Sequence, residues 1–357
     1  MNDIKQHIRL WAFLTVALLL AACTADDPSA ETGNGKSEVH LMPYMQTFHD
    51  ADLTTRRALP TGYESFEPTN VMQMVLYLAH DEQIPLSTLT YFPAPNDVWN
   101  SSVDLVANEE YKIYGFMPRK IGSEHSATYH SDGIDLTLNN LPPLTDKDLC
   151  VITGVLQGSK DGDISTSDIV RGKFDYTGKS AEDGNYIYLL LDHIYASLDF
   201  QFKVDANYSK LRTIKLKEVK LTTTQVAMAS VTLNIRENNN GTNPMTINWA
   251  STSGTYEHTI YNSDSSDGTA LTTSYVPLAT AQFAPVSGAV KMTMTCTYDV
   301  YTADGKTVVS NRTAVNDLTN IVGLTSGQKR KIKISVNPTY LYILADPDLD
   351  NPTITID

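Results

Sequence analysis

The chain has 357 residues, with 41 acidic against 27 basic side chains and a formal net charge of −14. This excess of negative charge excludes nucleic acid as a main partner, because nothing would offset repulsion by the phosphates. Short alternating runs rich in Thr, Val, Ile and Tyr, broken by Gly, Asn, Asp and Pro, predict an all-β protein.

Residues 1–22 are predicted to be a lipoprotein signal peptide. Lys5 and Arg9 precede an apolar run, Leu10 to Ala22, that is too short to span a bilayer as a helix. The run closes on Leu20-Ala21-Ala22-Cys23, which matches a bacterial lipobox in which Cys23 becomes the lipidated N-terminus. Several acyl chains on Cys23 would anchor the precursor durably to the outer membrane.

Residues 23–57 are predicted to be a leader made of a tether and one strand. The stretch from Thr24 to Ser37 contains Gly, Ser and Asp without periodicity, as in a flexible linker. The next residues alternate between apolar and more polar, which is the pattern of a half-buried strand. Pro43 cannot donate to a ladder, so this strand is expected at a sheet edge. Its apolar residues are Val39, Leu41 and Met45.

A dibasic pair, Arg56-Arg57, ends the leader. No other arginine lies between Arg9 and Arg56. An arginine-directed protease acting on an exposed leader would therefore meet this pair first. Two surface arginines in a loop are the alternative interpretation.

The first block after the leader, residues 58–183, is predicted to be a β-sandwich. Alternating runs such as Met72 to Leu78 and Ile134 to Leu138 are separated by turn sequences, with no convincing helical stretch. The polar turn Ser180 to Asn185 separates two strongly patterned runs and is the expected domain junction.

The second block, residues 184–357, is predicted to be another β-sandwich that opens with the strand Tyr186 to Leu191. Its clearest alternation runs from Val290 to Val300 and leads into Thr302-Ala303-Asp304-Gly305, a hairpin signal. A slip in the alternation predicts a β-bulge at Glu218.

No sequence motif for catalysis or for a cofactor stands out, so neither an enzyme nor a cofactor is expected. Gly178-Lys179-Ser180 has the wrong spacing from its upstream glycine for a phosphate loop. His125 and His130 are expected on opposite faces of a strand, where they could not share a metal. The remaining cysteines, Cys150 and Cys296, are expected to be buried and unbridged.

An acidic cluster near the C-terminus has part of the spacing of a calcium loop. Asp346, Asp348 and Asp350 would occupy its first three ligand positions, but Asn351 stands where such a loop requires glycine. Solvated turn carboxylates are the favoured interpretation, and no metal site is expected.

Two stretches resemble the fimbrillins of Bacteroidales, the pilin subunits of type V pili. One runs from Asp192 to Phe200 and continues from Arg212 to Val219, and the other is the C-terminal run Val336 to Pro352. The resemblance implies two tandem transthyretin-like β-sandwich domains behind a lipoprotein signal peptide and leader strand. It also implies that a trypsin-like or arginine-specific protease removes the leader with its strand.

Carried over to this chain, the resemblance places the cut between Arg57 and Ala58, uncertain by one residue, and makes Val39 to Gln46 the expelled strand. The C-terminal strand of another subunit would fill the opened groove. This donor strand lies within 340–357, and its apolar residues are Tyr340, Leu341, Tyr342, Ile343, Leu344, Ile354 and Ile356. A plain closing strand of the chain's own second domain is the alternative for this tail.

The function expected from these features is that of a stalk pilin at the cell surface, with other copies of itself or related fimbrillins as partners. The alternative is a surface adhesin or glycan-binding lipoprotein, of the kind found at a fimbrial tip. Such a protein would display loops to host or bacterial ligands and would not polymerise through its tail.

Overall fold

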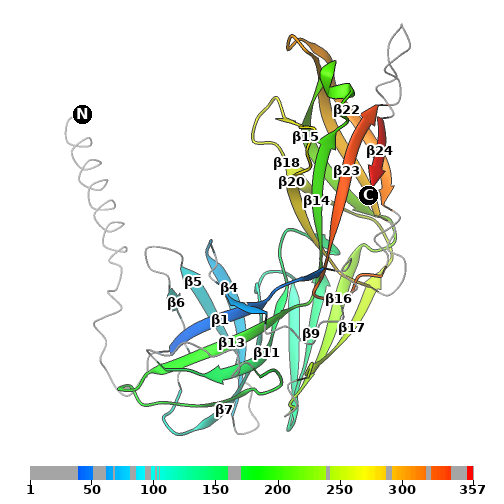
Figure 1. Ribbon diagram of the computed structural model, residues 1–357. Helices are drawn as coiled ribbons and strands as arrows, with labels where there is room; N and C mark the ends of the chain where they lie inside the picture. Colours follow the sequence, from blue (N-terminus) through cyan, green and yellow to red (C-terminus); the bar gives the residue numbers. More distant parts are fainter. Residues whose placement is uncertain are drawn as a thin grey trace, which may run out of the picture. The chain divides into compact units, whose positions relative to one another are not determined.

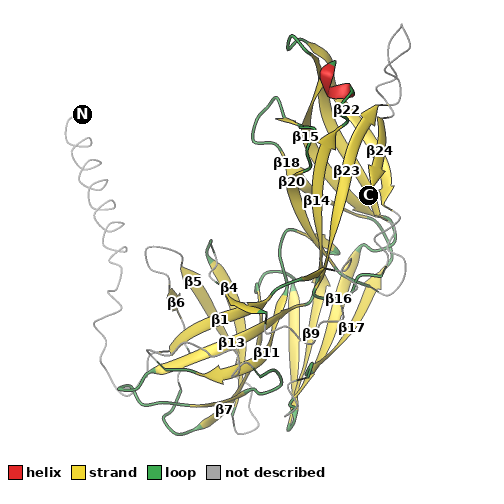
Figure 2. Ribbon diagram, viewed as in Figure 1, coloured by secondary structure: helices red, strands yellow, loops and turns green. Residues whose placement is uncertain are grey.

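The computed structural model describes residues 39–50, 62–66, 69–80, 86–92, 98–100, 103, 105–159, 170–238, 242–286, 292–318, 323–338 and 352–356. Within these residues almost every regular element is a strand, and a single 3-10 turn, Tyr208–Lys210, is the exception (Figure 2). The all-β prediction is confirmed. None of the described residues form a helix with the length and apolar character needed to cross a membrane.

A nine-stranded and a four-stranded sheet enclose the first hydrophobic core (Figure 1). The larger sheet has the order β3-β1-β13-β11-β7-β4-β5-β6, with β12 also paired to β7, and the smaller has the order β17-β16-β9-β8. The strands of the larger sheet are β1 (Val39–Gln46), β3 (Tyr63–Ser65), β4 (Met72–Ala79), β5 (Leu86–Phe92), β6 (Val98–Asn100), β7 (Glu110–Met117), β11 (Cys150–Gln157), β12 (Asp175–Thr177) and β13 (Asn185–His193). Those of the smaller sheet are β8 (Glu124–His130), β9 (Gly133–Leu141), β16 (Met228–Arg236) and β17 (Met245–Thr252).

A six-stranded and a five-stranded sheet enclose the second core. The first of these has the order β10-β20-β14-β23-β2, with β24 also on β23, and the second has the order β18-β15-β21-β22, with β19 also on β15. The six strands are β2 (His49–Asp50), β10 (Leu144–Thr145), β14 (Ala196–Val204), β20 (Val276–Phe283), β23 (Gln328–Pro338) and β24 (Pro352–Ile356). The five are β15 (Arg212–Thr223), β18 (Tyr256–Asn262), β19 (Thr269–Ala270), β21 (Met292–Thr302) and β22 (Thr307–Leu318).

The two cores divide the chain differently from the junction expected at residues 183/184. Strand β13, expected to open the second domain, lies inside the first sheet between β1 and β11. The chain passes from one core to the other between Tyr195, which is buried in the first, and Ala196, which is buried in the second. The polar turn before β13, with Gly184 at a φ of 70°, is a connection within the first sandwich.

The hairpin β16–β17 also departs from the expected division, because it returns to the first sandwich after β14 and β15 have entered the second. Val231, Leu233 and Ile235 are buried in the first core and pair with β9. In the other direction, Leu144 of β10 is buried in the second core. Alternation reveals that a strand has a buried face, but it does not reveal which sheet covers that face.

Local predictions agree closely with the strands. A register shift between β15 and β21 falls between Leu216 and Glu218, next to the expected bulge. The turn between β21 and β22 contains Asp304 and Gly305, as the hairpin signal predicted. Cys150 and Cys296 are free, buried, and located in different cores.

Candidate functional site: the leader strand and its groove

Strand β1, which belongs to the predicted leader, lies within the first sheet. It runs parallel to β13 over seven register pairs, from Val39↔Asn185 to Met45↔Leu191 (Figure 1). On its other side, Tyr44–Gln46 pairs antiparallel with β3. Strand β1 therefore lies one place in from the edge expected from Pro43, because the short strand β3 covers one end of it.

The core-facing side of β1 carries the three apolar residues that the alternation identified. Leu41 is 7% exposed, and Val39 and Met45 pack against the first core. Burial of one apolar side chain and much of two others contributes roughly 3–6 kcal/mol. On the opposite face, His40 stacks on Tyr186 with ring centroids 4.6 Å apart. The leader is thus held from both faces of the sheet.

Beyond β1, the leader continues into a sheet of the second sandwich. Strand β2 pairs parallel with β23 through His49↔Gln328 and Asp50↔Lys329. The backbone N–H of His49 donates to the carbonyl of Gly327 at 2.9 Å. One continuous leader segment, residues 39–50, therefore supplies a strand to a sheet of each sandwich.

A buried polar network attaches β3 to the same sheet without using β1. Tyr63 and Thr153 both donate to Asp192 Oδ1, Thr153 at 2.9 Å, and the Arg171 guanidinium pairs with Asp192 Oδ2. The side chains of Arg171 and Asp192 are 12% and 6% exposed. Burial, followed by the Asp192 charge, raises the pKa of Tyr63, so its hydroxyl remains a donor. Among the described residues, the first strand after the arginine pair is therefore held by its pairing with β1 and also by side-chain contacts that do not involve the leader.

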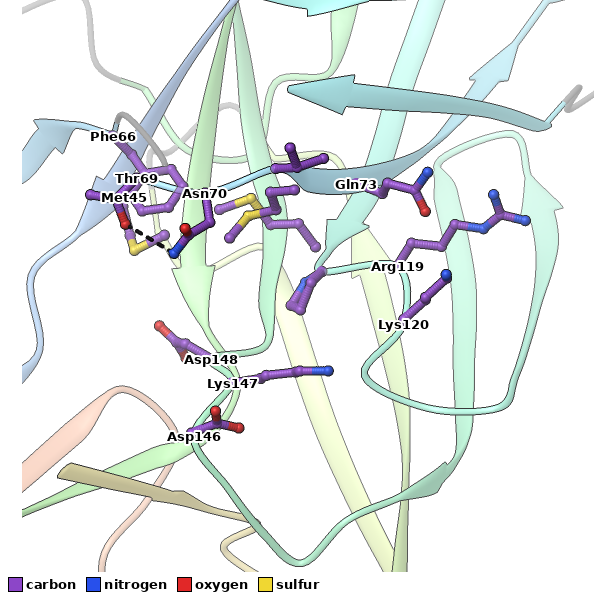
Figure 3. A pocket seen from close by; sticks show the side chains of 14 residues that line it. Met45, Phe66, Thr69, Asn70, Gln73, Arg119, Lys120, Asp146, Lys147 and Asp148 are labelled. Atoms are coloured by element: carbon purple, nitrogen blue, oxygen red, sulfur yellow. Dashed lines mark hydrogen bonds between the residues drawn. The ribbon is translucent and has the colours of Figure 1, made fainter. Parts of the chain in front are cut away.

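Leader residues also contribute to the lining of two hollows. One, with a volume of about 690 Å³, has Met45 and Phe66 on one side and Arg119 and Lys120 on the other (Figure 3). The other, of about 380 Å³, is lined by the leader residues Met45–Phe48 together with β3, Asp148, His193 and Lys329. The leader thus contributes Met45 alone to the first hollow and four residues to the second.

The C-terminal tail ends on the chain's own second sandwich. Ile354 and Ile356 lie on β24, which pairs antiparallel with β23 through Ile354↔Val336 and Ile356↔Ile334. Since β14 pairs along the other edge of β23, strands β2 and β24 meet the same edge at opposite ends. Leader and tail therefore share one edge of β23, at its opposite ends.

Several predicted positions lie outside the described residues. They are Cys23, Arg57, Ala58, Tyr340, Leu341, Tyr342, Ile343, Leu344 and the acidic positions Asp346, Asp348 and Asp350. Of the histidines considered, His125 shares a hydrogen bond with the Tyr77 hydroxyl at 2.7 Å, and His130 pairs with Asp135 at 2.9 Å. The structure thus gives these two histidines separate partners.

Sequence reasoning did not find a cluster of three possible metal ligands that lies beside Phe48 of the leader. Asp148 and Cys150, two residues apart, meet His193 of the paired strand β13. His193 Nδ1 lies 2.5 Å from Asp148 Oδ2, and its ring stacks on Phe48 of the leader at 3.6 Å. The Asp-x-Cys spacing was visible in the sequence, but the pairing with His193 depends on the register of β11 and β13.

Comparisons with known proteins find no family model and no curated protein that match the chain. Among solved structures, a candidate cell adhesion protein from Bacteroides fragilis has 10% identity and a TM-score of 0.47, covering 90% of this chain and 97% of that one. A fimbrial protein from Bacteroides vulgatus has 13% identity and a TM-score of 0.38, covering 88% and 98%. A fimbrial anchor protein from Porphyromonas gingivalis has 11% identity and a TM-score of 0.26, covering 89% and 95%. At these values the likenesses carry no argument about function, which must come from the chain itself.

Proposed function

We propose that the chain is a structural subunit of a fimbrium, exported as a lipoprotein through Cys23, cut after Arg57 and assembled by strand exchange. The position of the leader carries this proposal. Strands β1 and β2 complete sheets of both sandwiches, while the arginine pair follows them in the sequence and precedes β3. Cleavage at the pair would leave the leader bound by noncovalent contacts alone.

Loss of β1 would leave an edge of β13 without its backbone partner and uncover the apolar surface under Leu41. An incoming strand would recover both, because strand addition supplies main-chain hydrogen bonds while alternate side chains fill the vacated positions. Before cleavage the covalently attached leader competes at a high effective concentration. The precursor is thereby protected from premature assembly.

The tail supplies the proposed donor. Its apolar residues fall within Tyr340–Leu344 and at Ile354 and Ile356. Burying four or five such side chains would contribute roughly 6–15 kcal/mol before the cost of ordering them. A polymer joined in this way would persist without a covalent link between subunits.

Brief trypsin treatment of the purified precursor tests the proposal. We expect a stable fragment that begins at Ala58 or Arg57, followed by a ladder of oligomers on native gels. A chain with Arg56→Gln and Arg57→Gln should keep β1 attached and remain monomeric, even where trypsin cuts after Lys36 in the tether. A chain truncated before Tyr340 should be cut and folded but monomeric. Unchanged assembly of the truncated chain would refute the donor assignment.

One observation favours a second candidate, a tip-type adhesin. Strand β24 already pairs with β23 of its own chain over five residues, as a closing strand would. An adhesin whose tail closes its own second sandwich would be trimmed by trypsin without forming oligomers. In that case, a monomeric product of the full-length chain would select this function over the stalk subunit.

A further inference from the structure

Asp148, Cys150 and His193 bring three different metal-binding atoms together beside the leader. Asp148 lies two residues before Cys150, just outside β11, and its Oδ2 comes within 3.4 Å of Cys150 Sγ. His193 is the register partner of Cys150 on β13. The three ligand atoms lie within 4.8 Å of one another.

The arrangement does not fit a nucleophilic relay. A relay needs the imidazole to contact the nucleophile through one nitrogen and the carboxylate through the other. Here Cys150 Sγ and Asp148 Oδ2 both meet His193 Nδ1, at 3.5 and 2.5 Å. Cys150 is also fully buried, out of reach of a substrate. Convergence of three atoms on one point is the pattern of ligands around a shared ion.

We propose that Asp148, Cys150 and His193 bind one divalent transition-metal ion of the zinc type. A thiolate, an imidazole and a carboxylate together suit zinc. Bond lengths of about 2.0–2.3 Å place tetrahedral ligand atoms roughly 3.3–3.6 Å apart. Cys150 Sγ already lies 3.5 Å from His193 Nδ1 and 3.4 Å from Asp148 Oδ2. Only the histidine–aspartate pair has to separate, by roughly 1 Å, for the ion to enter.

A second observation at the cluster favours a cation as ligand. Asp148 Oδ1 is buried, and no hydrogen bond from a described residue reaches it. A buried carboxylate oxygen without a partner is costly, and a cation would satisfy it. Three protein ligands would leave a fourth position for a further ligand, next to the hollow that Asp148 and His193 line.

The leader covers this site. Phe48 lies flat on the His193 ring, with centroids 3.6 Å apart and planes 13° from parallel. In the precursor, metal exchange is therefore slowed by an aromatic lid, and release of the leader uncovers the site. This link to release rests on the proposed strand exchange, whereas the site itself does not.

The test uses the full-length chain in detergent, stripped of metal and titrated with Co²⁺ and with Zn²⁺. We expect one ion per chain, a thiolate-to-cobalt charge-transfer band and a rise in Tm on zinc binding. Asp148→Asn and Cys150→Ser should weaken binding by about tenfold or more, and Cys150→Ser should abolish the charge-transfer band. Cys296→Ser, which removes the other buried thiol, is the matched control and should bind as the wild type does.

Absence of stoichiometric binding, or equal loss in Cys150→Ser and Cys296→Ser, would overturn the site. Because the Asp148 side chain is partly exposed, Asp148→Asn should fold even where a core substitution does not. The lid is tested with Phe48→Ala, which should release bound zinc to a chelator several-fold faster than the wild type. If Phe48→Ala binds zinc with unchanged affinity and releases it at the wild-type rate, Phe48 is not a lid. The metal site itself would not be contradicted by that result. Oligomer formation is not a readout here, so failure of the metal site and failure of strand exchange are distinguishable.

Discussion

The two sandwiches differ in how their interiors are completed. In the first, strand β13, the neighbour of the leader, carries three of the buried polar residues found among the described positions: Asn185, Asp192 and His193. The second core is enclosed by strands whose apolar and polar residues alternate. In β23, for example, buried Ile332 and Ile334 alternate with lysines. Its main buried charge is Asp299, paired with Lys217 at 2.8 Å.

This difference indicates that the first sandwich is the one whose integrity depends on the leader. It takes a whole strand of seven register pairs from the leader, whereas the second takes only the two pairs of β2. Its polar groups also require partners brought from several segments. Loss of the leader should therefore loosen the first sandwich much more than the second.

The largest expected effect is that of removing the leader when no donor strand is available. Trypsin cleavage of a chain truncated before Tyr340, followed by removal of the leader in mild denaturant, should destabilise the first sandwich by about 5 kcal/mol or more. Hydrogen exchange should then rise along β13 and stay low along β21. A synthetic peptide of residues 39–50 should restore protection, and a scrambled peptide should not. An equal rise in hydrogen exchange in both sandwiches would contradict the inference that only the first depends on the leader.

The next largest effect concerns the ion pair between Arg171 and Asp192, whose side chains are 12% and 6% exposed. Asp192→Asn leaves Arg171 without its anion and weakens the contacts of Tyr63 and Thr153. Removing one partner of a buried pair costs about 3–5 kcal/mol because the remaining charge is uncompensated. Urea denaturation should show this loss in the first sandwich, together with faster protease cutting near β3. Arg171→Lys, which keeps the charge, should lose less, and a larger loss in Arg171→Lys would contradict the ion-pair explanation.

Much of this architecture could be predicted because strands and turns are local. Alternation identified β1, β4, β9 and β21, and the slip near Glu218 marked a real change of register. The burial of Leu41 follows from the same pattern, since a two-residue period fixes the face on which a side chain lies.

The assignment of strands to cores could not be predicted, because it depends on pairings between distant segments. Nothing in residues 228–252 distinguishes a hairpin of the first sandwich from one of the second. The cluster of Asp148, Cys150 and His193 was missed for the same reason, since it exists only in the observed register of β11 and β13. The alternation of apolar and polar residues shows that a side chain faces the core. Which side chains it meets in the core depends on how distant strands pair.

A smaller effect is expected at the buried charge of the second sandwich. Burial acts to raise the pKa of Asp299, but hydrogen bonds from Lys217 and the backbone N–H of Asn311 outweigh it and lower the pKa. Since the folded-state pKa is depressed, the stabilisation is present above the unfolded value of about 4 and is lost as the pH falls through the folded value. Asp299→Asn should therefore cost about 2–3 kcal/mol at neutral pH and little in strong acid. Urea denaturation of wild type and variant at neutral pH and in strong acid measures this difference in unfolding free energy. The stability of the first sandwich should be unaffected.

The smallest effect tests the hairpin that returns to the first sandwich. Asp135 on β9 accepts hydrogen bonds from Asn234 and Arg236 of β16, and from His130 when that ring is protonated or carries its proton on Nε2. Burial opposes these contacts, yet together they lower the Asp135 pKa to about 2. The stabilisation is therefore complete above pH 4 and disappears as the pH falls through 2. Because the side chain is 30% exposed and screened by water, Asp135→Asn should cost only about 1 kcal/mol at pH 7. Wild type and variant should converge below pH 2, and a difference that persists there would show that packing, rather than charge, attaches β16 to β9.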